Sequence, residues 1–236
     1  PPEVLCVADG TGWRVRVFPN KYPATDDHEV IVETADHDVT FDRIAHAPAV
    51  VRVFVDRYRA LSRREGVASV VLFRNCGPAG GASLAHPHSQ VTALPFVPPR
   101  VARESAAFTS AAECPLCPLR EHLIAETPHF LRIAPAGSQM PYEQWVIPRR
   151  HRNEIASLSD EEITDLAAVL QSATAAMQKR WASYNWIFMN FPRNPAAHFY
   201  LSLFPRVAGI AGFELESGSF IQVVDPEQTA RMLRGS

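Results

Sequence analysis

The sequence lacks an excess of charge of either sign. It contains 23 lysine and arginine residues against 25 aspartate and glutamate residues, which gives a formal net charge of -2 at pH 7. Proteins that wrap nucleic acid carry a strong basic excess, so this composition argues against a nucleic-acid partner. Any anionic ligand must therefore be bound by a local group of residues.

Long apolar runs are missing as well. No stretch approaches the roughly 18 apolar residues of a membrane span, and the start of the chain lacks the charged and apolar regions of a signal peptide. We therefore expect no membrane partner and a cytoplasmic protein. The 236 residues suffice for one large domain or for two of about 110 residues.

Cysteine is scarce, with four residues in the chain. Cys114 and Cys117 form a C-P-L-C pair, and in a reducing compartment this spacing indicates metal or redox chemistry before it indicates a disulfide. Cys6 and Cys76 are isolated, and each is more typical of a small buried apolar residue than of a ligand.

The chain contains a weak internal repeat, in which residues 29–37 align with residues 143–151 at a constant offset of 114. Each copy is a predicted strand that ends in a histidine. The elements that follow correspond in order and in type. They are a helical pattern over 51–61 and 163–177, an apolar strand over 70–75 and 186–190, and a second histidine strand over 86–95 and 198–205.

The spacing of the histidines matches too, since His37 and His86 are 49 residues apart and His151 and His198 are 47 apart. We therefore predict an α+β fold of two tandem histidine-strand units, each an antiparallel sheet with a packed helix. The predicted boundaries are 1–96 for the first unit, 97–113 for a linker and 114–236 for the second unit.

The two copies differ in the motif H-P-H-S-Q at residues 86–90. Tyr200 stands at the position of His88, and Ser202 stands at the position of Gln90. Only the first unit can therefore use the additional histidine chemically.

His88 is the candidate nucleophile of the first unit. In a strand, residues i, i+2 and i+4 share one face, so His86, His88 and Gln90 are expected to point the same way. A neutral imidazole attacks phosphorus well at neutral pH and gives a covalent nucleotidyl-histidine. A single histidine is more often a hydrogen-bonded structural residue, but this polar group beside a glycine loop favours a site.

The loop before this strand is rich in turn-forming residues. Its Gly80 and Gly81 predict backbone amides that approach a phosphate closely, and Ser83 adds a hydroxyl. Gln90 could bind a nonbridging phosphate oxygen, while Ser83 and the loop amides stabilise the transferring phosphoryl group.

Cys114 and Cys117 supply half of a tetrahedral zinc site, and His151 and His198 are the predicted other half. Such a closed site would be structural. The alternatives are a turn with two free thiols and a thioredoxin-like redox pair, although no strand leads directly into a helix at C-P-L-C.

By the repeat, His37 and His86 are the histidine half of an equivalent site in the first unit. No C-x-x-C motif precedes them, and Cys6 is alone. The first unit has therefore either lost its metal or has its cysteines upstream of residue 1.

Together these motifs resemble the galactose-1-phosphate uridylyltransferase-like proteins of the histidine-triad superfamily. In chain order the shared motifs are W-R-V-R-V to P-N-K-Y-P over 13–23, F-R-N at 73–75, G-G-A-S at 80–83, H-P-H-S-Q at 86–90, C-P-L-C at 114–117 and G-F-E at 212–214. The resemblance covers nearly the whole chain, and H-P-H-x-Q is a specific signature.

The resemblance implies that His88 is the nucleotidylated residue and that Gln90 assists it. It also implies that Ser83 and Asn75 contact phosphate and that Asn20 lies near the nucleotide. The zinc ligands that it implies are Cys114, Cys117, His151 and His198, with His37 and His86 as a second half-site that lacks its cysteine pair. A homodimer is implied as well.

The implied reaction moves a nucleoside monophosphate from a nucleotide sugar to a sugar 1-phosphate in two half-reactions. Residues 207–214 lack the lysine and tyrosine that contact the hexose phosphate in true uridylyltransferases. They look more like the ADP-sugar phosphorylase branch, in which inorganic phosphate is the acceptor. A nucleotide-binding or hydrolytic histidine-triad protein and a zinc-stabilised scaffold without activity are the remaining alternatives.

Overall fold

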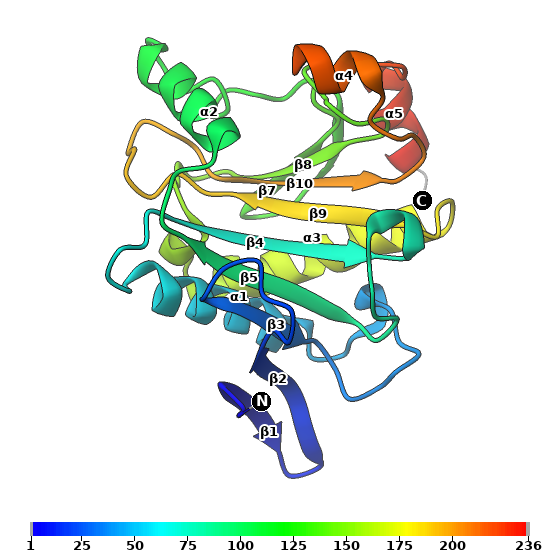
Figure 1. Ribbon diagram of the computed structural model, residues 1–236. Helices are drawn as coiled ribbons and strands as arrows, with labels where there is room; N and C mark the ends of the chain where they lie inside the picture. The colour runs from blue at the N-terminus through cyan, green and yellow to red at the C-terminus, as the bar shows by residue number, and fades with distance from the viewer. Residues whose placement is uncertain (1, 235–236) are drawn as a thin grey trace.

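The two halves of the chain each contribute five strands to one antiparallel sheet (Figure 1). The structure is a computed structural model that describes residues 2–234. The strands of the first half are β1 (Leu5–Asp9), β2 (Gly12–Pro19), β3 (His28–Val32), β4 (Ser69–Cys76) and β5 (His88–Leu94). Those of the second half are β6 (Leu123–Glu126), β7 (Phe130–Ile133), β8 (Gln144–Pro148), β9 (Tyr184–Met189) and β10 (Tyr200–Pro205).

The strand order displays the internal repeat. Read from each edge to the centre, the order is β1-β2-β3-β5-β4 in the first half and β6-β7-β8-β10-β9 in the second. β4 and β9 pair at the centre, with Phe73 opposite Ile187 and Asn75 opposite Asn185. The predicted α+β fold is confirmed. The two units share one sheet, because this central pairing satisfies the backbone groups that each unit would otherwise expose at an edge.

One face of the sheet is covered by α1 (Ala47–Ser62) and α3 (Asp160–Gln178), which lie behind it in Figure 1. The apolar periodicity predicted both helices, and residues of those patterns such as Phe54 and Leu166 are fully buried. They join side chains of both half-sheets in one core. Burial of such side chains stabilises the fold by about 1.5–3 kcal/mol each.

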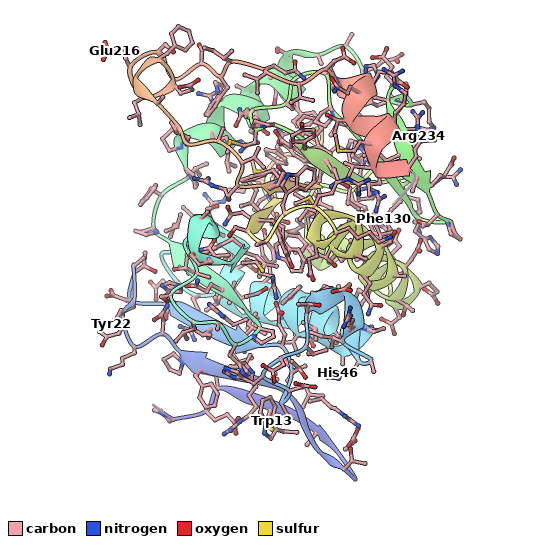
Figure 2. The ribbon with its side chains drawn as sticks, turned by 90° about the vertical axis from the view of Figure 1, so that its right-hand side faces the viewer. Trp13, Tyr22, His46, Phe130, Glu216 and Arg234 are labelled. Carbon is pink, nitrogen blue, oxygen red and sulfur yellow. The ribbon has the colours of Figure 1, made fainter. Side chains whose placement is uncertain are left out.

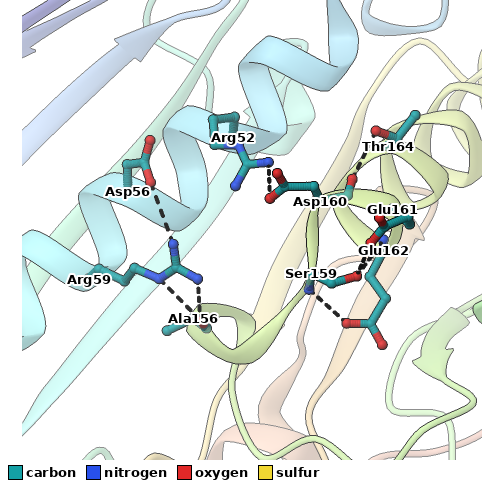
Figure 3. A network of polar contacts seen from close by, with 9 residues as sticks. All are labelled: Arg52, Asp56, Arg59, Ala156, Ser159, Asp160, Glu161, Glu162 and Thr164. Atoms are coloured by element: carbon teal, nitrogen blue, oxygen red, sulfur yellow. Dashed lines mark hydrogen bonds and ion pairs between the residues drawn. The ribbon is translucent and has the colours of Figure 1, made fainter.

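Polar contacts join the two helical segments where the halves meet (Figure 3). Arg59 of α1 donates two hydrogen bonds to the carbonyl oxygen of Ala156, at 2.6 and 3.1 Å, and Arg52 pairs with Asp160 at 2.6 Å. The second pair is largely exposed to solvent, so it contributes no more than about 1 kcal/mol.

The start of α3 carries the capping box that its sequence predicts (Figure 3). The Glu162 backbone N–H donates to Ser159 Oγ at 3.3 Å, and the Ser159 backbone N–H donates to the Glu162 carboxylate at 2.8 Å. Two amides that the helix itself leaves unpaired are satisfied in this way.

The opposite face of the sheet is covered over its second half. There α2 (Pro99–Ser110) and the loop over 111–119 pack against Ile147 and Tyr200. On the first half, by contrast, Val30 remains half-exposed.

Most of the predicted linker over residues 97–113 is the helix α2. Pro99 begins the helix, where the missing N–H of proline costs no hydrogen bond. Arg100 and Glu104 then form an i,i+4 pair at 2.8 Å. The segment between the units thus packs on the sheet of the second unit.

Figure 2 shows the two faces in profile. His46, at the start of α1, lies on the helical side, and Tyr22, in the loop after β2, lies on the other side. On that second side the half-exposed Val32 and Phe73 leave part of the first half-sheet accessible.

The remaining elements are short. They are η1 (Phe41–Arg43), η2 (Pro78–Gly80), η3 (Ile155–Ser157), α4 (Gly212–Ser217) and α5 (Pro226–Arg234). Within residues 2–234, no helix has both the length and the apolar character needed to cross a membrane.

Candidate functional site

His88 is the first residue of β5, between β3 and β4 in the sheet. Its neighbours Ser89 and Val91 point to the helical side, so His88 and Gln90 point to the opposite face. The His88 side chain is largely buried, with 5% of the residue exposed. Strand alternation therefore places the predicted nucleophile and the predicted phosphate-binding amide side by side.

The two ring nitrogens of His88 have different surroundings. Nδ1–H donates to the backbone carbonyl oxygen of His86 at 2.8 Å. A carbonyl can only accept, so the proton of the neutral ring sits on Nδ1 and the lone pair on Nε2. Within the described chain, Nε2 makes no hydrogen bond. It is also not one of the side-chain atoms that are completely buried without a hydrogen-bond partner. This is the arrangement that a histidine nucleophile needs.

The Gln90 amide is held by its oxygen. Oε1 accepts hydrogen bonds from His28 Nε2 at 2.9 Å and from Asn20 Nδ2 at 3.3 Å. No residue in 2–234 accepts a hydrogen bond from Gln90 Nε2. The structure thus brings Asn20 into contact with Gln90, as expected for two residues of one site.

Asn75, the last but one residue of β4, is held in the same way. Its Oδ1 accepts from Asn185 Nδ2 at 2.8 Å, and the same Nδ2 also donates to the Gly80 carbonyl oxygen at 2.8 Å. Within the described chain the Asn75 amide nitrogen has no acceptor. The amide oxygens of Gln90 and Asn75 therefore accept hydrogen bonds from other residues of the chain, and their N–H groups are left free. Free N–H donors of this kind can bind an anionic ligand such as a phosphoryl group.

The glycine loop differs from its prediction. The Gly80 N–H donates to the Gly77 carbonyl oxygen at 3.1 Å, and the Gly81 N–H donates to the Pro78 carbonyl oxygen at 3.0 Å. These amides close the turns of the loop itself. Ser83 is exposed and has no hydrogen bond within 2–234, so its hydroxyl remains the group that the loop offers to a ligand.

His86 is turned away from the face that carries His88 and Gln90. β5 begins at His88, after Pro87, because a proline has no N–H for the strand ladder. The His86 ring instead donates from Nε2 to the Thr34 carbonyl oxygen at 2.8 Å and places Nδ1 2.8 Å from His37 Nδ1. The expectation that His86 shares a face with His88 and Gln90 is therefore wrong, whereas its pairing with His37 is present.

Two residues of the site were not predicted, His28 and Asn185. His28 precedes the aligned strand 29–37, and its side chain shares the face of Val30, which lies opposite Gln90. Strand alternation was the signal that could have found it. Asn185 belongs to the second unit and contacts Asn75 across the central strand pair, so only the tertiary structure reveals it.

Cys114, Cys117, His151 and His198 form the group of ligands that the sequence predicted. One ligand atom from each lies within 4.8 Å of all the others, and the group could hold a metal ion. Cys117 Sγ lies 3.3 Å from His151 Nδ1, and Cys114 Sγ lies 3.5 Å from His198 Nδ1. Tetrahedral bonds of about 2.3 Å to sulfur and about 2.0 Å to nitrogen require separations of roughly 3.5 Å, so the residues fit zinc.

Both histidines of this group are oriented by the backbone. His151 Nε2–H donates to the Pro195 carbonyl oxygen at 2.9 Å, and His198 Nε2–H donates to the Pro148 carbonyl oxygen at 3.0 Å. These bonds leave each Nδ1 lone pair for a metal. Burial, and then the neighbouring His151, lower the pKa of His198 to about 4, which keeps the ring neutral as a ligand must be.

Sequence and structure comparisons place the chain among known proteins. A family model described as the N-terminal domain of DUF4931, a domain of unknown function, matches residues 9–97. A galactose-1-phosphate uridylyltransferase of Thermotoga maritima is 32% identical over 87% of this chain and 73% of its own length. The chain belongs to the galactose-1-phosphate uridylyltransferase family. It is therefore a nucleotidyltransferase.

Two ADP-glucose phosphorylase matches cover nearly the whole chain. The ADP-glucose phosphorylase of Arabidopsis thaliana is 27% identical over 99% of this chain and 78% of its own length. A crystal structure of an Arabidopsis thaliana ADP-glucose phosphorylase with bound ADP-glucose has a TM-score of 0.92, at 27% identity, and covers 100% of this chain and 86% of that one.

Proposed function

We propose that the protein transfers a nucleoside monophosphate from a nucleotide sugar to a sugar 1-phosphate through a covalent intermediate on His88. The observation that carries the proposal is the His88 ring, whose Nδ1–H is held by the His86 carbonyl at 2.8 Å while Nε2 stays unbonded. A structural histidine would be expected to use both nitrogens when it is this buried.

In the first half-reaction, the Nε2 lone pair attacks the α-phosphorus of the nucleotide sugar. An N–P bond forms, the P–O bond to the sugar phosphate breaks, and the sugar 1-phosphate leaves with the bonding electrons. In the second half-reaction, a phosphate oxygen of the acceptor attacks the same phosphorus and the N–P bond breaks. The imidazole returns to its neutral form, so no proton is gained or lost by the ring over the cycle.

The polar groups around His88 have distinct roles in this proposal. The free N–H groups of Gln90 and Asn75 bind the nonbridging phosphoryl oxygens, where negative charge grows in the transition state. Ser83 contributes its exposed hydroxyl, and the turns at Gly80 and Gly81 shape the loop that delivers it. Asn20 lies beside the nucleotide.

A second candidate differs only in the acceptor. The similarity to the ADP-glucose phosphorylase structure over the full chain, with a TM-score of 0.92, favours inorganic phosphate as the acceptor in place of a sugar 1-phosphate. The covalent intermediate on His88 is the same in both. The product distinguishes them, because a phosphorylase releases a nucleoside diphosphate.

The metal in the Cys114, Cys117, His151 and His198 group is proposed to be zinc. Four protein ligands close the tetrahedron, so the ion would stabilise the second unit and take no part in the transfer. A cytoplasmic location, whose reducing conditions keep the thiols free for the metal, belongs to the proposal.

A homodimer is also proposed. Residues 207–223 carry six exposed apolar side chains, Val207, Ile210, Phe213, Leu215, Ile221 and Val223, and α4 buries none of its residues. In Figure 2, Glu216 of α4 lies on the same side as Tyr22, away from α1 and α3. Exposed apolar side chains in such number are typical of a protein interface. Light scattering should give twice the chain mass, and Phe213→Glu with Leu215→Glu should give the monomer mass.

The decisive experiment uses ADP-glucose and UDP-glucose labelled in the α-phosphate. The protein is incubated with each, and the labelled peptide is identified by mass spectrometry at neutral or alkaline pH, where phosphohistidine survives. We expect the nucleotide on His88. Each nucleotide sugar is then tested with glucose 1-phosphate, galactose 1-phosphate and inorganic phosphate as acceptors. Turnover without any label on His88 would refute the covalent mechanism.

A further inference from the structure

We infer that His28 is a positioning residue, which holds the Gln90 amide so that its N–H2 group, and not its carbonyl, faces the transferred phosphoryl group. The inference rests on the proposed function. It concerns a residue that lies one side chain away from the reacting atoms and therefore acts only through Gln90.

The hydrogen bonds of the His28 ring determine its tautomer. The backbone N–H of Ala24 donates to His28 Nδ1 at 3.0 Å. A backbone amide can only donate, so Nδ1 carries the lone pair and the proton of the neutral ring sits on Nε2. Nε2–H then donates to Gln90 Oε1 at 2.9 Å. Asn20 Nδ2 lies 3.3 Å from the same oxygen and 3.3 Å from His28 Nε2. Because Nε2 carries the ring proton and has no lone pair to accept with, Asn20 donates to the Gln90 oxygen.

Burial keeps the ring in this neutral form. His28 is 7% exposed at the start of β3, and this burial lowers its pKa below the ordinary value, although the bond to Gln90 opposes the shift. Near neutral pH the ring therefore has one donor and one acceptor, each with a fixed partner.

The two ends of a glutamine amide are nearly equal in size, so packing alone does not decide which end faces the ligand. With the amide reversed, Gln90 Nε2 would face the His28 Nε2–H, and its oxygen would face the phosphoryl oxygens. The first contact sets two donors against each other, and the second sets acceptor against acceptor. His28 therefore favours the one orientation that binds an anion.

The second amide of the site is held by the same principle. Asn185 donates to Asn75 Oδ1 at 2.8 Å and leaves the Asn75 N–H2 group free. In both Gln90 and Asn75, the amide oxygen accepts a hydrogen bond from a neighbouring side chain and the N–H2 group is left free. This agreement supports a role of the His28 contact in ligand binding.

The test compares His28→Gln with His28→Asn in the full, metal-loaded chain. The amide nitrogen of glutamine can occupy the place of His28 Nε2 and keep the bond to Gln90. The shorter asparagine reaches only the place of Nδ1 and loses that bond. With the nucleotide sugar that labels the wild type, we expect the single-turnover rate of nucleotidylation to fall about 10- to 100-fold in His28→Asn, with KM changed less than about 3-fold, and to stay within about 3-fold of wild type in His28→Gln.

A double-mutant cycle separates positioning from folding. In a Gln90→Ala background the amide is gone, so His28→Asn should cause no further loss of rate. Equal losses with and without Gln90 would overturn the inference, as would a His28→Asn protein of wild-type rate. The unfolding temperature and metal content of each variant are measured alongside.

The tautomer can be measured on the unmutated protein, even if His28→Asn fails to fold. The 15N chemical shifts of the His28 ring should show a proton on Nε2 and a lone pair on Nδ1, and the opposite tautomer would overturn the inference. If the wild type leaves no label on His88, the proposed function fails, whereas the tautomer result stands on its own.

Discussion

The two units carry the same histidine pair in two chemical settings. The ring centroids of His37 and His86 are 4.9 Å apart at an interplanar angle of 50°, and those of His151 and His198 are 4.9 Å apart at 55°. Within residues 2–234, only the second pair meets two cysteines. Nearly the same ring geometry thus occurs in a group that could hold a metal ion and in a histidine pair without cysteines. The difference lies in the two cysteines that another segment supplies.

The units also differ at the position of His88, the candidate nucleophile of the first unit, where the second unit has Tyr200. Tyr200 donates from its hydroxyl to Glu104 at 2.8 Å and accepts from Arg100 at 3.3 Å. Its ring packs against Trp145 in a tilted arrangement, with ring centroids 4.4 Å apart. A cavity of about 370 Å³ bounded by these residues lies under α2, away from His88. The duplicated surface is partly accessible at the candidate site in the first unit and is covered by α2 in the second.

The largest expected effect comes from replacing His88, and the matched control replaces its counterpart Tyr200 in the second unit. His88→Ala should lower the rate of nucleotidyl transfer by at least about 1,000-fold, because the covalent route is lost. Tyr200→Ala should leave the label on His88 in place, although it weakens the packing of α2. Measured rates and labelled peptides decide this, and a His88→Ala protein that still takes up label would contradict it.

Removal of the metal should affect stability next most. In Cys114→Ser, or after chelation of the wild type, we expect about one zinc per chain to be lost and the unfolding temperature to fall by about 10 °C or more. Structural zinc contributes several kcal/mol, and 1 kcal/mol corresponds to roughly 2–4 °C at this chain length. Cys6→Ser, which changes an exposed thiol, is the control. Elemental analysis that finds no zinc in the wild type would contradict the site.

The junction of the units can be strained at Gly77. Its φ is 73°, and an added Cβ would overlap Ser183 at the start of the second unit's central strand. Gly77→Ala should lower the free energy of unfolding by about 2–4 kcal/mol, from the overlap and the left-handed backbone together. Gly66→Ala, with a φ of 77° and open space around it, isolates the backbone part at about 1 kcal/mol. Equal losses of stability in Gly77→Ala and Gly66→Ala would show that the structure shifts to relieve the overlap with Ser183.

The smallest expected effect belongs to the Tyr200 hydroxyl. Tyr200→Phe should lower the free energy of unfolding by about 1 kcal/mol, because the hydroxyl loses its part-buried hydrogen bonds with Glu104 and Arg100 while these two residues stay paired. Tyr22→Phe, at an exposed position, should cause no change. Denaturant unfolding resolves the difference, and a loss as large as that of Gly77→Ala would mean that α2 depends on this hydroxyl.

The helices and the second histidine pair were predictable from the sequence, whereas the position of His86 and the helix α2 were not. Apolar periodicity predicted α1 and α3, because each helix buries one continuous stripe. The internal repeat predicted that His151 and His198 lie in one group, and the structure places them together. Strand alternation failed for His86, because Pro87 interrupts the strand, and residues 97–113, predicted as a linker, form mostly the helix α2.

The contacts that orient the site could not be predicted, because their partners are far apart in the chain. His28 and Gln90 are separated by 62 residues, and Asn75 and Asn185 by 110. A hydrogen bond between side chains needs both to be placed within a few tenths of an ångström, which periodicity and spacing do not specify.

Local pattern alone predicted a duplicated α+β chain with one candidate histidine nucleophile, one group of four candidate metal ligands and a tyrosine at the position equivalent to that histidine. Those features depend on residue type and short-range spacing. The tertiary structure decided that the units share one sheet, that α2 covers only the second, and that the two amides of the site present nitrogen and not oxygen. Each of these depends on contacts between residues that are far apart in the chain, and local spacing does not specify such contacts.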